Sequence, residues 1–323
     1  MPFIEVKNIS KNFKIFKNRP GKLGAAVSLF HREYETKKAV SDISFSVEQG
    51  EITGYIGPNG AGKSTTIKML SGVLTPDEGE IRVGEIIPYK ERKKNAKRIG
   101  VVFGQRSQLY WDLPVSDTFS LYRKLYEIPK ALYDHNKKMY IDLFDMGGFI
   151  NQSVRQLSLG QKMKANLALS MLHDPDVLYL DEPTIGLDVM SRKNLRQGIQ
   201  TLNREKNTAI ILTTHDMSDI EAVCGRLIVI DRGQKLFDGS LENFKNLYED
   251  GFLIKMEFAS LPEWETLPGF TLKNNDNNVW NIKVDKNIRH KDALNTLINH
   301  YNPEKISVHE QDIEDIVQRI FAE

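Results

Sequence analysis

The sequence has one cysteine, no long apolar run and almost no net charge, and each of these absences excludes a class of protein. Because Cys224 has no second cysteine to pair with, the chain cannot form an internal disulfide, which fits a reducing compartment. No segment approaches the roughly 20 apolar residues that a helix needs to cross a bilayer, so the chain by itself cannot be a membrane channel. Lys and Arg number 44 and Asp and Glu number 43, so no overall electrostatic field attracts the chain to nucleic acid or anionic lipid.

The start and the length of the chain set further limits. The first residues, MPFIEVKNIS, lack the basic and then apolar pattern of a signal peptide, so we expect a cytoplasmic location. At 323 residues the chain is longer than one average domain and suits one large domain with a smaller one.

Short apolar runs alternate with helical stretches over the first part of the chain, which predicts an α/β fold with a largely buried sheet. The expected strands are 52–56, 99–103, 177–180, 209–213 and 227–230. The turn signal at 231–234 and the run 235–238 then predict a hairpin. Between about 106 and 160, helical signals replace the strand signals, so we expect a helical subdomain there.

The pattern of expected strands and helices changes after about residue 245. Strands are expected at 252–258 and 279–284, separated by an Asn-rich turn at 273–278, and helices at 291–299 and 310–321. We therefore predict a large domain over residues 1–245 and a small α+β domain over 246–323. Trp264 and Trp280 of the small domain suit its core better than a ligand site.

The stretch GPNGAGKST at 57–65 follows the strand 52–56 and precedes an expected helix at 64–70, which is the setting of a phosphate-binding loop. Glycines let backbone N–H groups surround phosphates, Lys63 neutralises the β and γ phosphates, and Ser64 offers an oxygen to Mg²⁺. A Gly-rich turn with a purely structural role is the alternative. The residues that we expect to bind ATP here are Gly57, Pro58, Asn59, Gly60, Ala61, Gly62, Lys63, Ser64, Thr65 and Thr66.

Two acids end the apolar strand 177–180. Such a strand delivers them to the sheet edge where ligands bind. We expect Asp181 to hold Mg²⁺, directly or through water, and Glu182 to orient and partly deprotonate the attacking water. A strand that ends in solvated acids is the alternative.

The sequence LSLGQ at 157–161 resembles LSGGQ, the signature of ATP-binding cassette (ABC) ATPases. Other marks of that family stand around it in order: Gln105 in VVFGQ, DEPT at 181–184, GLD at 186–188 and His215 in TTHD. The resemblance covers roughly residues 3–240. It implies a P-loop NTPase with a RecA-like core sheet, an antiparallel β-subdomain and a helical signature subdomain.

In ABC ATPases two such domains face each other head to tail, and each ATP lies between one phosphate-binding loop and the partner's signature. The resemblance therefore implies that Ser158, Gly160 and Gln161 bind the γ-phosphate of an ATP held by a second copy, and that Asp188 reaches across the dimer. A homodimer is the expected assembly.

The resemblance also assigns the remaining catalytic and metal-binding residues. Gln105 corresponds to the residue that meets Mg²⁺ and water, so the expected metal ligands are Ser64, Gln105 and Asp181. His215 corresponds to the switch histidine that contacts the γ-phosphate. With Glu182, these residues form the expected hydrolytic set.

Adenine needs an aromatic platform, since stacking on one aromatic face is worth about 1 to 3 kcal/mol. Phe13 stands where the family usually has Tyr, and we expect it to stack on the base. Phe13 could equally be a core residue, and Phe16 is a rival platform.

Two features point to a subset of the family. Leu159 replaces the usual first Gly of the signature, and the sequence SLGQ followed by Lys162 and Lys164 is similar to ATPases that serve ABC-2 exporters. Residues 107–119 lie where a permease is expected to dock, and the pair Tyr110-Trp111 suits an interface.

Residues 17–38 form an insertion with apolar residues at helical spacing among basic ones, which predicts an amphipathic helix. It could contact a membrane surface or a permease, or simply pack on its own domain. The basic run 90–98 could bind RNA or lipid, but such runs are usually solvated helix faces, so we do not expect nucleic acid as a partner.

We therefore expect an ATPase subunit at the cytoplasmic face of the membrane, which works as a dimer beneath separately encoded permeases of an exporter. The alternative is a soluble ABC protein that acts on ribosomes or DNA. Translation factors of this superfamily usually have two cassettes, and its chromosome and repair ATPases have long coiled coils; this sequence has neither.

Overall fold

The computed structural model describes residues 2–16, 34–103, 107–276 and 278–322. Contacts within the chain divide it into two units, Met1–Leu241 and Glu242–Glu323. The sequence placed the domain boundary at 245, four residues later than this division.

The first unit is built on a six-stranded sheet with the strand order β5-β6-β7-β3-β8-β9. Strands β3 and β5 to β8 run parallel, and β9 pairs antiparallel with β8 in the predicted hairpin. Every residue of β7 is buried, because layers cover both faces of a parallel sheet of this kind. The bounds are β3 Ile52–Ile56, β5 Ile99–Phe103, β6 Val177–Asp181, β7 Ala209–Thr213, β8 Arg226–Asp231 and β9 Gln234–Ser240.

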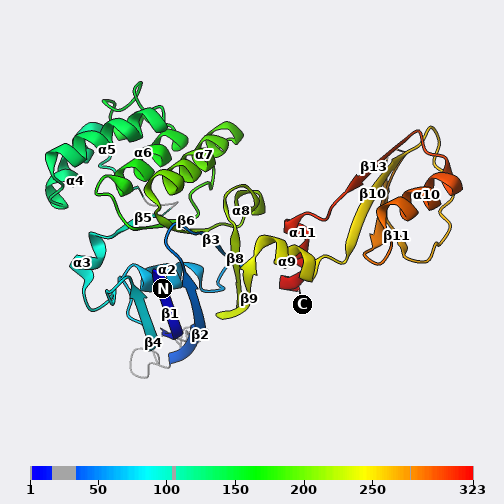
Figure 1. Ribbon diagram of the computed structural model, residues 1–323, viewed down its shortest axis with the longest axis horizontal. Coiled ribbons are helices and arrows are strands. Elements are labelled where there is room, and N and C mark those ends of the chain that lie inside the picture. Colours follow the sequence, from blue (N-terminus) through cyan, green and yellow to red (C-terminus); the bar gives the residue numbers. More distant parts are fainter. Residues whose placement is uncertain (1, 17–33, 104–106, 277, 323) are drawn as a thin grey trace, which may run out of the picture. The chain divides into compact units, whose positions relative to one another are not determined.

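A second, antiparallel sheet of this unit has the order β2-β1-β4. Helix α2 (Lys63–Leu70) lies between the two sheets (Figure 1), and its buried Ile67, Met69 and Leu70 belong to one core with both of them. The bounds are β1 Ile4–Phe16, β2 Tyr34–Val47 and β4 Glu78–Val83.

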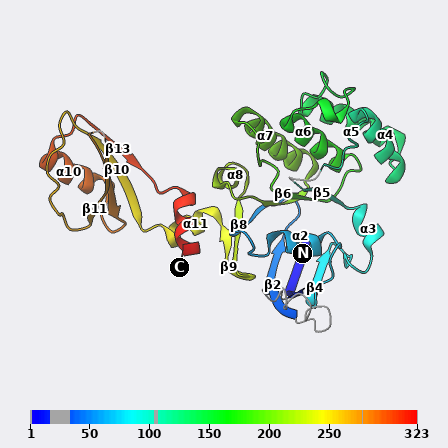
Figure 2. The same ribbon diagram turned by 180° about the vertical axis from the view of Figure 1, so that it is seen from behind.

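Helices α4 to α7 lie on the opposite side of the large sheet from the β2-β1-β4 sheet (Figures 1 and 2). Helices α4 and α5 begin directly after Pro114 and Pro129. The bounds are α3 Arg92–Ala96, α4 Val115–Leu125, α5 Lys130–Leu143, the 3-10 turn Val154–Gln156, α6 Leu159–Met171, α7 Val189–Lys206 and α8 Met217–Val223.

The predicted helix over the insertion 17–38 is wrong for its last five residues. Residues 34–38 belong to β2 and pair with β1, with Tyr34 opposite Phe16 and Lys37 opposite Phe13. Cross-strand hydrogen bonding along this hairpin overrides the helical spacing that ended at Tyr34. Residues 17–33 lie outside the described part of the chain.

The second unit is an antiparallel sheet of order β11-β12-β10-β13 with a helix on one face. Trp280 is 1% exposed and packs in one core with Ile254, Ile282 and Leu297. The bounds are α9 Leu241–Tyr248, β10 Gly251–Glu257, β11 Phe270–Asp276, β12 Val279–Asp285, α10 His290–Tyr301, β13 Lys305–His309 and α11 Ile313–Ala322.

Two strands of the second unit differ from the predictions. The Asn-rich stretch, expected to be a turn, continues β11 to Asp276, and Asn281 Nδ2 donates to Asn274 Oδ1 across the strand pair at 2.6 Å. Strand β13 was not predicted, although Ile306 and Val308 alternate with polar residues along it. It has only five residues, lies at the sheet edge and has no buried residue. Within the described ranges, no helix is both long and apolar enough to span a bilayer.

Candidate functional site

The carboxyl ends of three neighbouring parallel strands carry the predicted hydrolytic residues. Gly57 follows β3, Asp181 ends β6, and His215 comes two residues after β7. Strand β7 pairs with both others, and Asp181 lies opposite Thr213 in the ladder. The topology therefore gathers residues that are more than 150 positions apart at one edge, where α/β sheets bind ligands.

The loop between β3 and α2 depends on two glycines. A Cβ on Gly57 would lie 2.3 Å from the carbonyl oxygen of Ile230, and one on Gly62 would lie 2.4 Å from that of Ala39. Gly62 also has φ 110°, a conformation that side chains disfavour, and it precedes the first residue of α2. A Gly-rich loop that leads into a helix start can place backbone N–H groups around an anion.

Lys63 is withdrawn into this loop. The residue is 7% exposed, and Nζ donates to the carbonyl oxygens of Gly57 at 2.6 Å and Pro58 at 3.2 Å. Burial lowers the pKa of Lys63 below its ordinary value, while the nearby charges of Glu182 and Asp181 oppose this shift. A phosphate beside the ammonium would favour its charged form.

A group of oxygen ligands lies next to the loop. Ser64 Oγ donates to Asp181 Oδ1 at 3.3 Å, and Thr213 Oγ1 donates to the same oxygen at 2.6 Å. Hydroxyl and carboxylate oxygens are the ligands that suit Mg²⁺, which commonly takes few of them from protein and the rest from phosphates and water. Ser64 and Asp181 fit that pattern. Gln105, the third predicted ligand, lies outside the described residues.

Glu182 and His215 form a close pair. His215 Nδ1 lies 2.5 Å from Glu182 Oε2, so the imidazole N–H donates to the carboxylate. Glu182 has φ 57°, uncommon for a residue with a side chain, and its N–H donates to the carbonyl oxygen of Thr213 at 2.9 Å. The backbone after β6 thus turns the carboxylate toward the residue that follows β7.

A cavity of about 350 Å³ opens beside the loop. Phe13 lines it, as expected for the adenine platform, and the side chain of Phe16 lies outside the described residues. Ile15 and Lys37 also line it and escaped the sequence analysis. Strand alternation puts residues 13 and 15 on one face, and the pairing of Phe13 with Lys37 adds the third side chain; only the hairpin register reveals this set. The other residues of the lining are Ala39, Asn59, Gly60, Gly62, Lys63, Ser64, Thr65 and Glu182.

Thr66 differs from the rest of the loop. Its hydroxyl is fully buried, donates to the carbonyl oxygen of Gly62 at 3.2 Å and lies 3.1 Å from the hydroxyl of Tyr55. The side chain therefore packs under the loop rather than lining the cavity.

The signature residues lie at the starts of two neighbouring helices. Ser158 Oγ caps α6 by accepting from the N–H of Gln161 at 3.2 Å, and Gln161 Oε1 accepts in return from the N–H of Ser158 at 2.9 Å. Asp188 caps α7 through Ser191, whose hydroxyl donates to Asp188 Oδ2 at 2.6 Å. A Cβ on Gly160 would lie 2.5 Å from Ser191 Oγ, so the two helix starts are in contact. None of these signature residues lines the cavity beside the loop.

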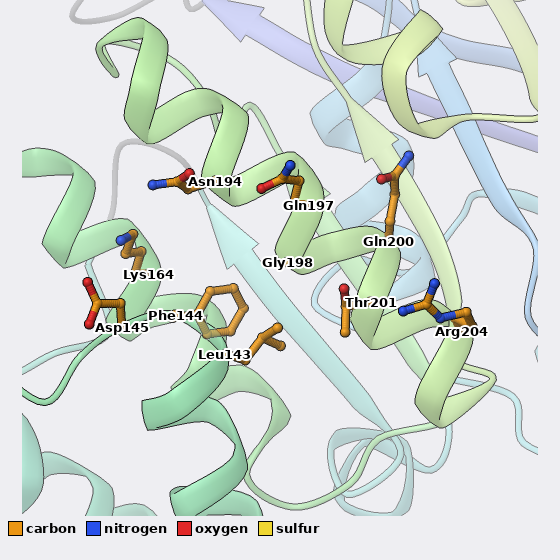
Figure 3. Close-up of a pocket in the computed structure, with 10 residues that line it drawn as sticks. All are labelled: Leu143, Phe144, Asp145, Lys164, Asn194, Gln197, Gly198, Gln200, Thr201 and Arg204. Atoms are coloured by element: carbon orange, nitrogen blue, oxygen red, sulfur yellow. The ribbon is translucent and has the colours of Figure 1, made fainter.

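A larger cavity, of about 490 Å³, lies elsewhere in the first unit, between α6, α7 and the end of α5 (Figure 3). Amide side chains line it, and its two cations, Lys164 and Arg204, lie at opposite ends of the view. Asp145 lies near Lys164 in the same view. Lys63, Ser64 and Glu182, which the sequence predicted to act on ATP, line the smaller cavity instead.

Comparison with known proteins shows which family this chain resembles. A family model described as ABC transporter matches residues 40–185. The chain is 35% identical over 225 residues to the ABC transporter ATP-binding protein NatA of Bacillus subtilis (strain 168), covering 68% of this chain and 88% of that protein. It is 32% identical over 235 residues to the linearmycin resistance ATP-binding protein LnrL of the same organism, covering 72% and 74%.

A solved structure supports the fold. The ATP-binding cassette MJ0796, in a dimeric post-hydrolysis state bound to ADP and Pi, aligns with a TM-score of 0.61 at 22% identity, over 74% of this chain and 98% of that one. The predicted P-loop α/β fold is confirmed. Since the identity to NatA extends over most of that relative, the chain belongs to the ABC transporter ATP-binding proteins, a family of ATPases.

Proposed function

We propose that this chain is the ATP-hydrolysing subunit of an ABC-2 exporter, working as a dimer beneath separate permeases at the cytoplasmic face of the membrane. One observation supports it above all: the phosphate-binding loop, an oxygen ligand set and the Glu182–His215 pair meet at one sheet edge, while the signature residues do not line the cavity beside that loop. An ATP held at the loop then needs a second chain to reach a signature.

The loop 57–66 would bind the phosphates and Phe13 would stack on adenine. Lys63 can extend from the loop carbonyls to the β and γ phosphates, exchanging neutral partners for charged ones. The exposed ring of Phe13 lies on the wall of the same cavity as the loop, which is the arrangement that an extended nucleotide requires.

Glu182 would act as the general base, and His215 would hold it in place while contacting the γ-phosphate. A base must lie within hydrogen-bond reach of the proton that it removes, and the Glu182 carboxylate lines the cavity beside Ser64. Ser64, Asp181 and Gln105 would hold Mg²⁺, which when bound neutralises charge on the phosphate oxygens. Thr213 keeps Asp181 oriented toward Ser64.

A second copy would complete the site with Ser158, Gly160, Gln161 and Asp188. Apolar side chains stand exposed around these residues: Leu159 is 47% exposed, Val189 84% and Met190 65%. Such side chains at adjoining helix starts suit a protein interface. The likeness to a cassette solved as a dimer agrees with this assembly.

A permease would dock near the start of α4. Tyr110 is 47% exposed and Trp111 59%, and Lys162 Nζ lies 4.6 Å from the Trp111 ring centre. Amphipathic aromatic side chains of this kind are enriched at interfaces. The resistance function named for one relative is in keeping with export.

The Glu182→Gln protein tests the hydrolytic part of this proposal. The amide keeps the shape of the carboxylate but cannot take a proton, so we expect turnover to fall by about 100-fold or more while ATP still binds. Hydrolysis at the normal rate would remove Glu182 from this role.

The same variant tests the transport part. A tagged Glu182→Gln protein, held in its ATP-bound dimer, is recovered from gently solubilised cells and its partners are identified by mass spectrometry. We expect polytopic membrane proteins. Recovery of ribosomes, DNA or soluble proteins alone would retain the ATPase chemistry and reject the exporter.

A further inference from the structure

A buried carboxylate lies behind the hydrolytic residues. Asp219 of α8 is 1% exposed, and three side chains donate hydrogen bonds to it. Thr184 Oγ1 donates to Oδ2, Thr214 Oγ1 donates to the same oxygen at 3.2 Å, and Arg196 Nε donates to Oδ1 at 2.6 Å. Burying a carboxylate is costly unless such partners satisfy it. Asp219 therefore joins three segments of the chain at one point.

The two threonines flank the hydrolytic pair. Thr184 comes two residues after Glu182, and Thr214 immediately precedes His215. Each hydroxyl is held by Asp219 and lies within two residues of a hydrolytic residue. The backbone of that hydrolytic residue therefore has little freedom to shift. Because both hydroxyls bind one carboxylate oxygen, the distance between the two segments is limited, and with it the 2.5 Å contact between Glu182 and His215.

Helix α7 anchors the carboxylate from the other side. Arg192 and Arg196 stand one turn apart on α7; Arg192 donates to Asp216, and Arg196 Nη2 donates to Ser218 Oγ at 2.7 Å as well as to Asp219. The start of α8 is thus fixed to α7.

We propose that Asp219 is a positioning residue for ATP hydrolysis, because it holds the segment after Glu182 and the segment carrying His215 in register. The inference rests on the proposed function, since it assumes that Glu182 and His215 act on bound ATP. Asp219 does not line the cavity, so it acts through the two threonines. Small displacements of a catalytic group reduce the rate far more than they reduce ground-state binding.

Matched pairs of substitutions isolate the two hydroxyls. Thr184→Val and Thr214→Val keep the volume and the Asp219–Arg196 contact but remove one donor, whereas Thr184→Ser and Thr214→Ser keep the donor. We expect each valine protein to lose about tenfold in kcat, with KM and the Kd for ATP within about twofold of the parent. We expect each serine protein to keep kcat within about threefold. Valine proteins that turn over like the serine proteins would overturn the proposal.

Thr208→Val is the control for a general packing effect. Thr208 is fully buried just before the amino end of β7, and its hydroxyl donates to the carbonyl oxygen of Pro175 at 3.4 Å. The chemical change is the same, but the site is at the opposite end of the strand, so kcat should not change. An equal loss of kcat in this control would also overturn the positioning role. If a valine protein at 184 or 214 fails to fold, alanine at that position is compared with serine by the same criteria.

A double substitution separates this inference from the proposed function. Thr184→Val should not slow single-turnover hydrolysis further when Glu182 is already Gln, since no general base is left to position. An additive loss would indicate that Thr184 does not act through Glu182. If Glu182→Gln alone keeps normal turnover, the proposed function fails. If it stops turnover while both valine proteins remain fully active, only the role of Asp219 is rejected.

Discussion

The two units of this chain bury different kinds of side chain. Among the described residues, every buried polar or charged side chain belongs to the first unit, and Lys63, Thr213 and Asp219 lie at or next to the proposed site. The described buried side chains of the second unit are all apolar, with Trp280 among the largest.

This difference reflects what each unit is arranged to do. A buried polar group costs free energy unless hydrogen bonds satisfy it, so a sheet edge that collects several of them needs partners from many segments. The first unit provides such partners at the ends of its parallel strands. The second unit stabilises itself through aromatic packing, and its charges pair nearer the surface. The following experiments test that contrast, from the largest expected effect to the smallest.

Trp280→Ala should destabilise the second unit and leave nucleotide binding intact. Trp280 contacts the rings of Phe258, Trp264 and Tyr301 at centroid distances of 4.9, 5.2 and 4.8 Å. Removing a buried Trp costs about 3 to 5 kcal/mol of unfolding free energy. Denaturant unfolding measures this loss, and titration with ATP measures nucleotide binding. The control Trp264→Ala changes a half-buried site, so it should cost less unfolding free energy. A large loss of ATP affinity would break the contrast, because it would make the site depend on the second unit's core.

Lys63→Ala should have the opposite effect, with ATP binding weakened by about 100-fold and the second unit unaffected. The loss corresponds to about 3 kcal/mol, the upper range for a hydrogen bond to a charged group. Equilibrium titration with a fluorescent ATP analogue measures it. Unchanged affinity would exclude Lys63 from phosphate binding.

The same variant tests the shared site. Lys63→Ala and Ser158→Arg proteins should each be inactive, whereas a mixture that forms heterodimers should recover part of the activity through one intact composite site. Heterodimers without recovery would argue that the signature does not act on the partner's ATP.

The first unit should lose stability as the pH falls toward 5, because it partly buries the ring of His173. Burial lowers the pKa of His173 to about 4; Nε2 bonds to the carbonyl oxygen of Ile99, and Nδ1 has no hydrogen-bond partner among the described residues. Between this pKa and the ordinary 6.5 only the unfolded chain binds the proton, so stability is lost over that window. We expect the free energy of unfolding to fall by about 2 kcal/mol between pH 8 and pH 5. Denaturant unfolding as a function of pH should show a weaker slope for His173→Phe, and an equal slope would refute this explanation.

Asp250 should make the stability of the second unit depend on pH as well, with a smaller effect and at lower pH than His173 in the first unit. Although burial raises its pKa, hydrogen bonds from Lys283, Arg319 and Gln311 lower it below the ordinary 3.8. The resulting stability is present above the ordinary pKa and is lost as pH falls through the lowered one. The carboxylate is 40% exposed, so solvent screening limits the effect of Asp250→Asn to roughly 1 kcal/mol. Thermal unfolding at pH 7 and pH 3 would measure it, and a loss that is no smaller at pH 3 would contradict the ionic explanation.

Much of the first unit could be predicted from local sequence. The strands 52–56, 99–103 and 209–213 have the predicted bounds, because short apolar runs between turn signals are typical of a sheet buried on both faces. The failures lie where local pattern is weak or misleading. The helical spacing of the insertion reaches Tyr34, but residues 34–38 pair as a strand. Strand β13 is a five-residue edge strand in which only Ile306 and Val308 are apolar, so its signal is short.

The site divides in the same way. Sequence motifs predicted roles for Lys63, Asp181, Glu182 and His215, because the proposed chemistry needs particular residue types at particular spacings. Motifs could not identify Ile15 and Lys37 on the cavity wall, or Asp219 behind the hydrolytic pair. Strand register brings Ile15 and Lys37 to the cavity, and long-range hydrogen bonds connect Asp219 to the hydrolytic segments.

By itself, the sequence determined the family, the α/β class and the residues with recognisable chemistry, since periodicity and motif spacing are local properties of the chain. Only the tertiary structure decided which side chains share the cavity with the loop and which buried carboxylate joins the segments of Glu182 and His215. The physical reason is that strand order and register bring together residues far apart in sequence, and no local pattern encodes those distances.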